Sequence, residues 1–236
     1  MQIVSKCILT LIAAAGMAVV IAALPGRTIA ANGVTVKLAE SPVPAEAAAE
    51  FRELVAPEAV QLSNDAGLLA EYWFCKEIPL SKKPGSASES LDSIAEITFV
   101  GIAKVHKDMK DFKNDEVIPG VYTMRIGIQP TDGNHLGTSP HPWFVILTPA
   151  HHDKALDGIT SHKQLAELSA EDTATDHPNI LSLQPLPAGD ETGEFPRAGK
   201  LSDEWKAIFL KLPGSTQDGE KIDLMFGMVY EGHGEI

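Results

Sequence analysis

Apolar and polar residues alternate with a period of two along much of this chain, the pattern of β-strands with one buried face. Residues 222–231 (IDLMFGMVYE) show this alternation most clearly. Several other runs are rich in β-branched and aromatic residues and lie between turn-forming segments. Residues 205–212 (WKAIFLKL) fit either a strand or a helix. We expect strands at 34–38, 70–75, 94–106, 121–128, 143–148 and 222–231.

Two short segments favour helices instead. Residues 44–55 are rich in Ala and Glu, begin with a proline and are followed by Pro57. Ser161 and Gln164 have the spacing of a capping box, in which the serine accepts a hydrogen bond and the glutamine reaches back. The remaining polar and proline-rich stretches predict connections at 81–93, 107–116 and 170–199.

Many short strands with few helices predict a mainly β fold, either an antiparallel β-sandwich or a jelly-roll-like domain with one or two short helices. Strands 121–128 and 143–148 flank a Gly-, Pro- and Asn-rich segment, so we expect a hairpin with a long tip at 129–142. We divide the chain into a signal peptide (1–30), an N-terminal strand and helix segment (31–66) and a β-sandwich domain (67–236).

The first thirty residues have the order of a secretory signal peptide. Lys6 precedes an apolar run at 8–24, and the small residues of 28–31 then offer a cleavage site near Ala30 or Ala31. The apolar run is close to the lower limit of about 17 residues for a membrane span, so a retained anchor is the alternative. We expect cleavage, a periplasmic or secreted mature protein, and no membrane association afterwards.

Charge and cysteine content limit the classes of partner. The 19 Lys and Arg include Lys6 and Arg27, so the rest of the chain has 17 basic against 32 acidic residues, a net charge of −15. Nucleic-acid binding depends on neutralising phosphates with Lys and Arg, so we expect no nucleic-acid partner. After cleavage Cys75 would be the only cysteine, which excludes an internal disulfide. Its aromatic, strand-like surroundings favour a buried thiol over a reactive one.

Standard catalytic motifs are missing from the sequence. It contains no G-x-S-x-G elbow, phosphate-binding P-loop, H-E-x-x-H or C-x-x-C. Many active sites are assembled from distant residues, so this absence does not exclude an enzyme, although it favours a protein without catalytic activity.

Histidines are concentrated around the predicted hairpin. Because imidazole suits copper and zinc, they are candidate metal ligands. A six-residue strand spans about 20 Å, so histidines at its two ends cannot share one ion. One set of ligands would lie on the tip, and the other would combine Asp153 with one of two adjacent histidines, since neighbours on an extended chain point to opposite sides. The alternative is that all are polar surface residues. The candidates are His135, His141, His151 and His152.

The tip has a second interpretation, because long loops on rigid β scaffolds often carry binding function. Asp132 and Asn134 are its candidate binding residues, although the glycine and glutamate of an EF-hand loop are missing.

The hairpin sequence itself resembles a known type of protein. The run beginning at Pro119 (PGVYTMRI) and the run beginning at Trp143 (WFVIL) are similar to a hairpin in exported bacterial β-sandwich families of unknown function. The resemblance covers residues 119–148. It implies an exported β domain, and it implies no activity or site residues.

These observations favour an exported, non-catalytic β-sandwich protein that binds a protein or small-molecule partner, with 129–142 as its surface. The alternative is a periplasmic copper- or zinc-binding protein that uses the loop histidines. The third hypothesis is a metal-dependent hydrolase.

Overall fold

One large antiparallel sheet organises the chain in the computed structural model, which describes residues 28–31, 33–86, 89–129, 139–173, 175 and 177–232. Among these residues the order of strands is β1-β2-β3-β4-β6-β9-β10-β11-β14-β13-β12, and β5 pairs in parallel with β13. The strands of this sheet are β1 Thr28–Ala31, β2 Val34–Glu40, β3 Glu58–Asn64, β4 Gly67–Phe74, β5 Ile78–Pro79, β6 Phe99–Val105, β9 Gly120–Ile128, β10 Trp143–Pro149, β11 Asn179–Gln184, β12 Arg197–Lys200, β13 Lys206–Ser215 and β14 Lys221–Glu231.

A few short elements complete the described fold. The two-stranded pair β7 (Met109–Lys110) and β8 (Glu116–Val117) forms a separate small sheet. The helices are α1 (Ala49–Leu54), α2 (His162–Ala170) and the 3-10 turn η2 (Leu91–Ser93).

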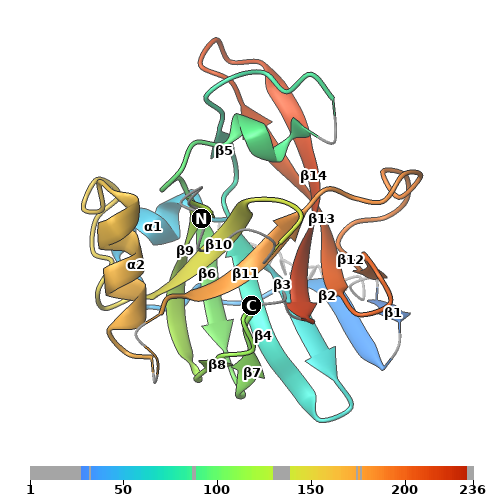
Figure 1. Cartoon of the computed structure of the whole chain (residues 1–236), viewed down its shortest axis with the longest axis horizontal. Helices are drawn as coiled ribbons and strands as arrows, with labels where there is room; N and C mark the ends of the chain where they lie inside the picture. The colour runs from blue at the N-terminus through green and yellow to red at the C-terminus, as the bar shows by residue number, and fades with distance from the viewer. Residues whose placement is uncertain are drawn as a thin grey trace, which may run out of the picture.

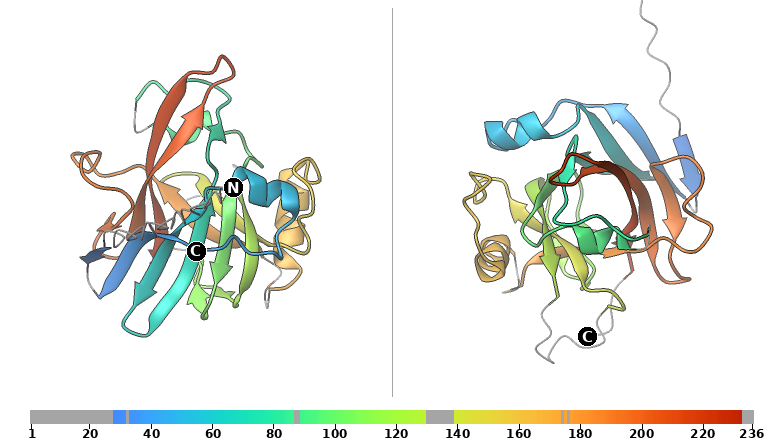
Figure 2. Two further views of the ribbon diagram at one scale, coloured as in Figure 1. Left: turned by 180° about the vertical axis from the view of Figure 1, so that it is seen from behind. Right: turned by 90° about the horizontal axis from the view of Figure 1, so that it is seen from above.

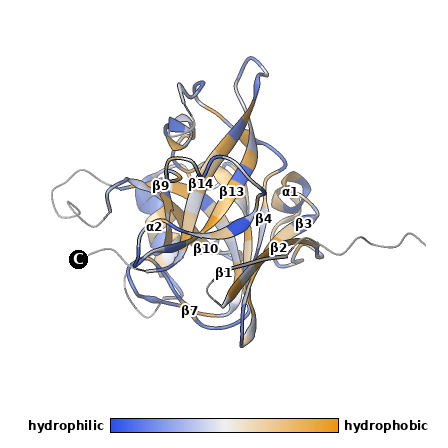
Figure 3. Cartoon of the chain, turned by 90° about the vertical axis from the view of Figure 1, so that its right-hand side faces the viewer, coloured by the Kyte–Doolittle hydropathy of each residue, from blue (hydrophilic) through white to orange (hydrophobic). Residues whose placement is uncertain are grey.

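The sheet curls so that its two ends approach each other, with β12 beside β1 and β2 (Figures 1 and 2). Side chains on the inner face form the main core, and hydrophilic residues gather in the connecting loops (Figure 3). This architecture confirms the predicted mainly β, sandwich-like class with two short helices. Examples of fully buried core residues are Tyr72, Ile102, Met124, Leu147 and Met228.

Most of the predicted strands are confirmed. The segments at 34–38, 70–75, 121–128, 143–148 and 222–231 lie in or largely within β2, β4, β9, β10 and β14. The ambiguous run at 205–212 is part of strand β13. β9 and β10 form the predicted hairpin, with Trp143 opposite Ile128, and the Gln129 amide donates to the Pro142 carbonyl at 2.7 Å at the base of the tip.

Two predicted boundaries differ from the structure. The strand expected from 94 begins only at Phe99, because Ile97 adopts a left-handed backbone (φ 70°) and Thr98 closes a turn onto Ala95. The helix expected at 44–55 is shortened to α1, since residues 44–47 form a turn.

Two connections contain strands that the sequence pattern did not predict. The connection at 107–116 includes β7 and the first residue of β8, and the connection at 170–199 includes β11. The sheet also continues across the expected domain boundary at 66–67, because β3 pairs with β4.

Helix α2 packs across β10, and this contact positions the site described below. Leu165 of α2 is buried against Ile146 of β10. At the other end of the helix, the Ser169 hydroxyl donates to the Leu147 carbonyl at 2.6 Å. Ser161 caps the helix as predicted by accepting from the Gln164 amide at 3.2 Å. The Gln164 side chain reaches back one residue further than a capping box requires, since it accepts from the Thr160 amide at 3.0 Å.

Cys75 is buried, as predicted, with its thiol 3.6 Å from the Phe99 carbonyl. Burial raises the pKa of this thiol to about 12, so it stays protonated near neutral pH.

The predicted signal peptide lies outside the described residues as far as residue 27. The expected cleavage positions, Ala30 and Ala31, fall in β1, which pairs with β2 at the edge of the sheet. Among the described residues, no helix combines the length and the apolar character needed to cross a bilayer.

Candidate metal centre

The end of β10 turns sharply and brings two adjacent histidines to one side. After Pro149 the chain closes a turn, in which the His152 amide donates to the Pro149 carbonyl at 2.9 Å. The backbone at His151 and His152 is therefore not extended, and the two rings lie together with centroids 4.0 Å apart. The expectation that neighbouring histidines point to opposite sides does not hold here, because it applies only to extended chain.

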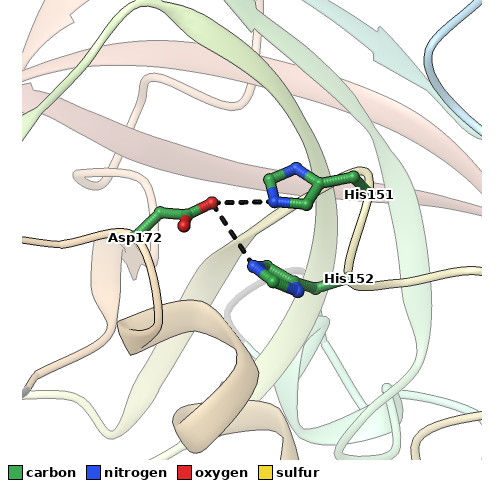
Figure 4. Close-up of side chains that lie close together, drawn as sticks. All are labelled: His151, His152 and Asp172. Atoms are coloured by element: carbon green, nitrogen blue, oxygen red, sulfur yellow. Dashed lines mark ion pairs between the residues drawn. The ribbon is translucent and has the colours of Figure 1, made fainter.

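The third member of the cluster comes from the turn that follows α2. Asp172 places Oδ2 at 3.0 Å from His151 Nε2 and at 3.3 Å from His152 Nε2 (Figure 4). One ligand atom from each of the three residues lies within 4.8 Å of the others. In a tetrahedral zinc site with ligand distances of about 2.0–2.1 Å, the ligand atoms are roughly 3.3 Å apart. The two nitrogen–oxygen separations are therefore close to those that such a site requires.

A second carboxylate contacts the opposite side of the His152 ring. Glu171 Oε2 lies 2.9 Å from His152 Nδ1, so His152 is bracketed by two consecutive acidic residues. The Nε2 atom of His152 is buried and has no partner with hydrogen-bonding geometry among the described residues, although Asp172 is close to it.

The cluster is open to solvent on its outer side. The His151 side chain is 62% exposed and Asp172 41%, whereas His152 is only 21% exposed. Two imidazoles and a carboxylate are ligands that zinc and copper accept, and the exposed side leaves a further coordination position for water or another ligand.

Asp153, the carboxylate that we expected beside these histidines, does not contact them and pairs with residues of β9 instead. It is buried and forms an ion pair with Arg125, with 2.7 Å between Nε and Oδ2. It also accepts a hydrogen bond from the Thr123 hydroxyl at 2.7 Å. Asp153 is therefore committed to a structural ion pair, and Asp172 takes the place next to the histidines.

The remaining candidates lie elsewhere. The His141 ring stacks on Trp143 with 5.6 Å between centroids and an interplanar angle of 15°. Burial lowers the pKa of His141, and the negative charge of Asp92 partly opposes this shift. His135, Asp132 and Asn134 lie outside the described residues.

A buried carboxylate also pairs with a histidine elsewhere in the described structure, where β4 lies between β3 and β6. Glu71 lies 2.8 Å from His106 Nε2 and accepts from the Gln61 amide group at 2.9 Å. Burial on its own would raise the pKa of Glu71, but hydrogen bonds from Ser41, Gln61 and His106 outweigh it and the pKa is lowered. With its oxygens occupied in this way, Glu71 serves to hold strands together.

The sequence analysis missed Asp172 and Glu171. They lie about twenty residues after the histidines in a segment that we interpreted as a loop. The capping box at Ser161 was the one available signal, because it predicted the helix that the structure shows packed against β10.

Comparisons with protein families, with curated proteins and with solved structures found no match to this chain.

Proposed function

We propose that this protein is an exported binding protein for a divalent transition-metal ion, zinc or copper, with His151, His152 and Asp172 as ligands. The observation that carries the proposal is the approach of two imidazole nitrogens to one carboxylate oxygen, at 3.0 and 3.3 Å. This function joins the expectation of a non-catalytic binding protein with the alternative of a metal-binding protein.

The hydrogen bonding of His152 supports a cation at this position. When Nδ1–H donates a hydrogen bond to Glu171, Nε2 of a neutral imidazole carries a lone pair that faces the Asp172 carboxylate. Two electron-rich atoms at this separation repel each other unless a positive charge lies between them. A bound metal ion supplies that charge, and protonation of His152 is the competing explanation.

The charge of the protein supports the same function. A net charge of −13 over the whole sequence attracts cations and disfavours nucleic acid and anionic surfaces. The predicted signal peptide would deliver the mature chain to the periplasm or the exterior, and the resemblance of residues 119–148 to exported β-sandwich proteins agrees with that destination. Mass spectrometry of the mature protein tests this part, with a first residue of Ala31 or Asn32 as the expected result.

Metal titration of the purified, metal-stripped protein tests the binding function. We expect one zinc or copper ion per chain in calorimetry and elemental analysis. The variant His151→Ala/His152→Ala and the variant Asp172→Ala should each lose this binding. The control is His162→Ala. Among the described residues His162 pairs with one carboxylate, Glu96, at 2.7 Å and belongs to no group of three potential metal ligands.

A tip variant separates the two sets of histidines. If His135→Ala/His141→Ala loses the ion while His151→Ala/His152→Ala and Asp172→Ala keep it, the tip is the metal site. Stoichiometric binding that survives in every variant, or its absence from the parent protein, contradicts the proposed function. Activity towards ester, phosphate or glycoside substrates that depends on the bound metal would instead favour the metal-dependent hydrolase.

A further inference from the structure

Two consecutive carboxylates hold the two nitrogens of one imidazole ring. Glu171 Oε2 is 2.9 Å from Nδ1 of His152, and Asp172 Oδ2 is 3.3 Å from Nε2 of the same ring. Both carboxylates come from the turn that follows α2, in which the Thr173 amide donates to the Ala170 carbonyl at 3.1 Å. The anchoring of α2 on β10 therefore fixes the ring and both carboxylates relative to one another.

The two carboxylates have different relations to the candidate ion. Asp172 faces both His152 Nε2 and His151 Nε2, which are the nitrogens that converge (Figure 4). Glu171 contacts Nδ1, the ring nitrogen that points away from this convergence. A carboxylate in that position accepts a hydrogen bond from Nδ1–H, which fixes the tautomer and the orientation of the ring and makes Nε2 more electron-donating.

We propose that Glu171 is a positioning residue for the metal site, acting through His152 rather than by coordinating the ion. This inference rests on the proposed function. It assigns a distinct role to each residue, with His151, His152 and Asp172 as ligands and Glu171 as the hydrogen-bond acceptor that orients the least exposed of them.

A purely structural role for the Glu171–His152 pair predicts a different behaviour. Glu171 is 50% exposed, and ion pairs near the surface contribute little to folding. Such a role would leave metal affinity unchanged when Glu171 is replaced. A positioning role predicts a loss of affinity with little change in stability, so the two can be separated by measuring both.

Metal affinity of Glu171 variants tests the inference. We expect Glu171→Ala to bind zinc or copper roughly 10–100-fold more weakly than the parent, the range typical for loss of such a partner. Glu171→Gln should recover part of this affinity, because its amide oxygen can still accept a hydrogen bond from Nδ1–H. The copper spectrum of Glu171→Ala should also shift, since a released imidazole ring changes its orientation towards the ion.

Glu167→Ala is the matched control. Glu167 lies on α2 with a 64% exposed side chain and, within the described part of the chain, pairs only with Lys163, at 3.7 Å. Its removal therefore changes the local charge equally without touching His152. The control should bind metal like the parent.

Three outcomes overturn the inference. If Glu171→Ala binds as tightly as the parent, Glu171 has no role in the site. If Glu167→Ala weakens binding equally, the effect is one of overall charge. If Glu171→Ala abolishes binding as completely as His152→Ala and glutamine restores nothing, Glu171 is itself a ligand. A parent protein that binds no metal refutes the proposed function instead, so the two failures are distinguishable.

Discussion

His152 and Asp153 are neighbours in the chain, yet they belong to two different kinds of polar cluster. Asp153 is 1% exposed, and its carboxylate receives hydrogen bonds from Thr123 and from two nitrogens of Arg125. His152 lies in a half-open cluster in which a buried nitrogen has no partner with hydrogen-bonding geometry among the described residues. One residue along the chain therefore separates a closed ion pair from an incomplete site.

The Arg125–Asp153 pair is closed because every donor of the guanidinium has an acceptor. Besides Asp153, the arginine donates to the carbonyls of Ile97, Ala155 and Leu156 at 3.0–3.2 Å. These bonds fasten the segment after β10 to the sheet. A buried charge that is fully paired in this way is costly to leave without its partner, and it offers nothing to a ligand.

The comparison gives a criterion for separating structural clusters from candidate sites. Both clusters contain carboxylates and nitrogen bases at similar distances, so composition and spacing do not distinguish them. The two clusters differ in the number of buried polar atoms that lack a hydrogen-bond partner. Buried polar groups normally have such a partner, so an exception requires an explanation. For His152 the explanation that we propose is a missing cation.

The largest expected effect is the loss of the closed pair. Asp153→Ala should lower the free energy of unfolding by about 3–5 kcal/mol, because it leaves the Arg125 charge buried without a partner. Urea denaturation followed by circular dichroism measures this change. Arg125→Met/Asp153→Leu should cost less than Asp153→Ala, since replacing both partners by apolar residues removes the unpaired charge. A double variant that is less stable than the single one contradicts this account.

The open cluster, formed by His151, His152, Glu171 and Asp172, should contribute little to stability without metal. Without metal, His151→Ala/His152→Ala should change stability by no more than about 0.5 kcal/mol, as for ordinary surface substitutions. With zinc at one hundred times its dissociation constant, the parent should gain about 2.7 kcal/mol and the variant nothing. Thermal or urea unfolding with and without zinc measures both values. A large loss of stability in the metal-free variant would show that these histidines support the fold.

Strand β14, which has an apolar inner face, was predictable from the sequence, whereas β11 was not. In β14 the residues Leu224, Phe226 and Met228 alternate and are buried on the inner face. In β11 the pattern is hidden by Asn179 and Gln184, which are buried and polar. Gln184 is accommodated because its amide group donates to the Ser139 hydroxyl, 45 residues earlier in the chain, at 3.0 Å. Tertiary hydrogen bonds of this kind leave no periodic signal in the sequence.

The candidate site was predictable only in part. Histidine is an uncommon residue and a frequent metal ligand, so His151 and His152 could be named as candidates from the sequence. The carboxylate beside them could not be named. Asp153 is adjacent in sequence but forms a buried ion pair with Arg125, and nothing in the sequence around Arg125 predicts that pairing. Asp172 reaches the site through the packing of α2 on β10, which is a property of the folded chain.

Tyr122 reports on the charge of Asp172 and provides the smallest of the expected effects. It lies on β9 opposite Pro149, and its hydroxyl donates to the Ile118 carbonyl at 2.7 Å. Burial raises the pKa of Tyr122 to about 12, and the negative charge of Asp172 adds to this shift. Because the pKa is higher in the folded than in the unfolded protein, where it is about 10, the associated stability is present below pH 10 and is lost between pH 10 and about 12.

Asp172→Asn in the metal-free protein should lower the pKa of Tyr122, while burial keeps it above 10. Absorbance near 295 nm follows tyrosine ionisation, and subtracting the titration of the matching Tyr122→Phe variant isolates this residue from Tyr230, whose pKa burial also raises to about 12. Asp157→Asn is the control, because Asp157 is an exposed aspartate in the same loop region as the closed pair. An unchanged Tyr122 titration in Asp172→Asn, or an equal shift in the control, would mean that the charge of Asp172 does not influence the pKa of Tyr122. In that case the carboxylate would be more fully screened by solvent than its position beside the two histidines implies, and its attraction for a cation would be correspondingly weaker.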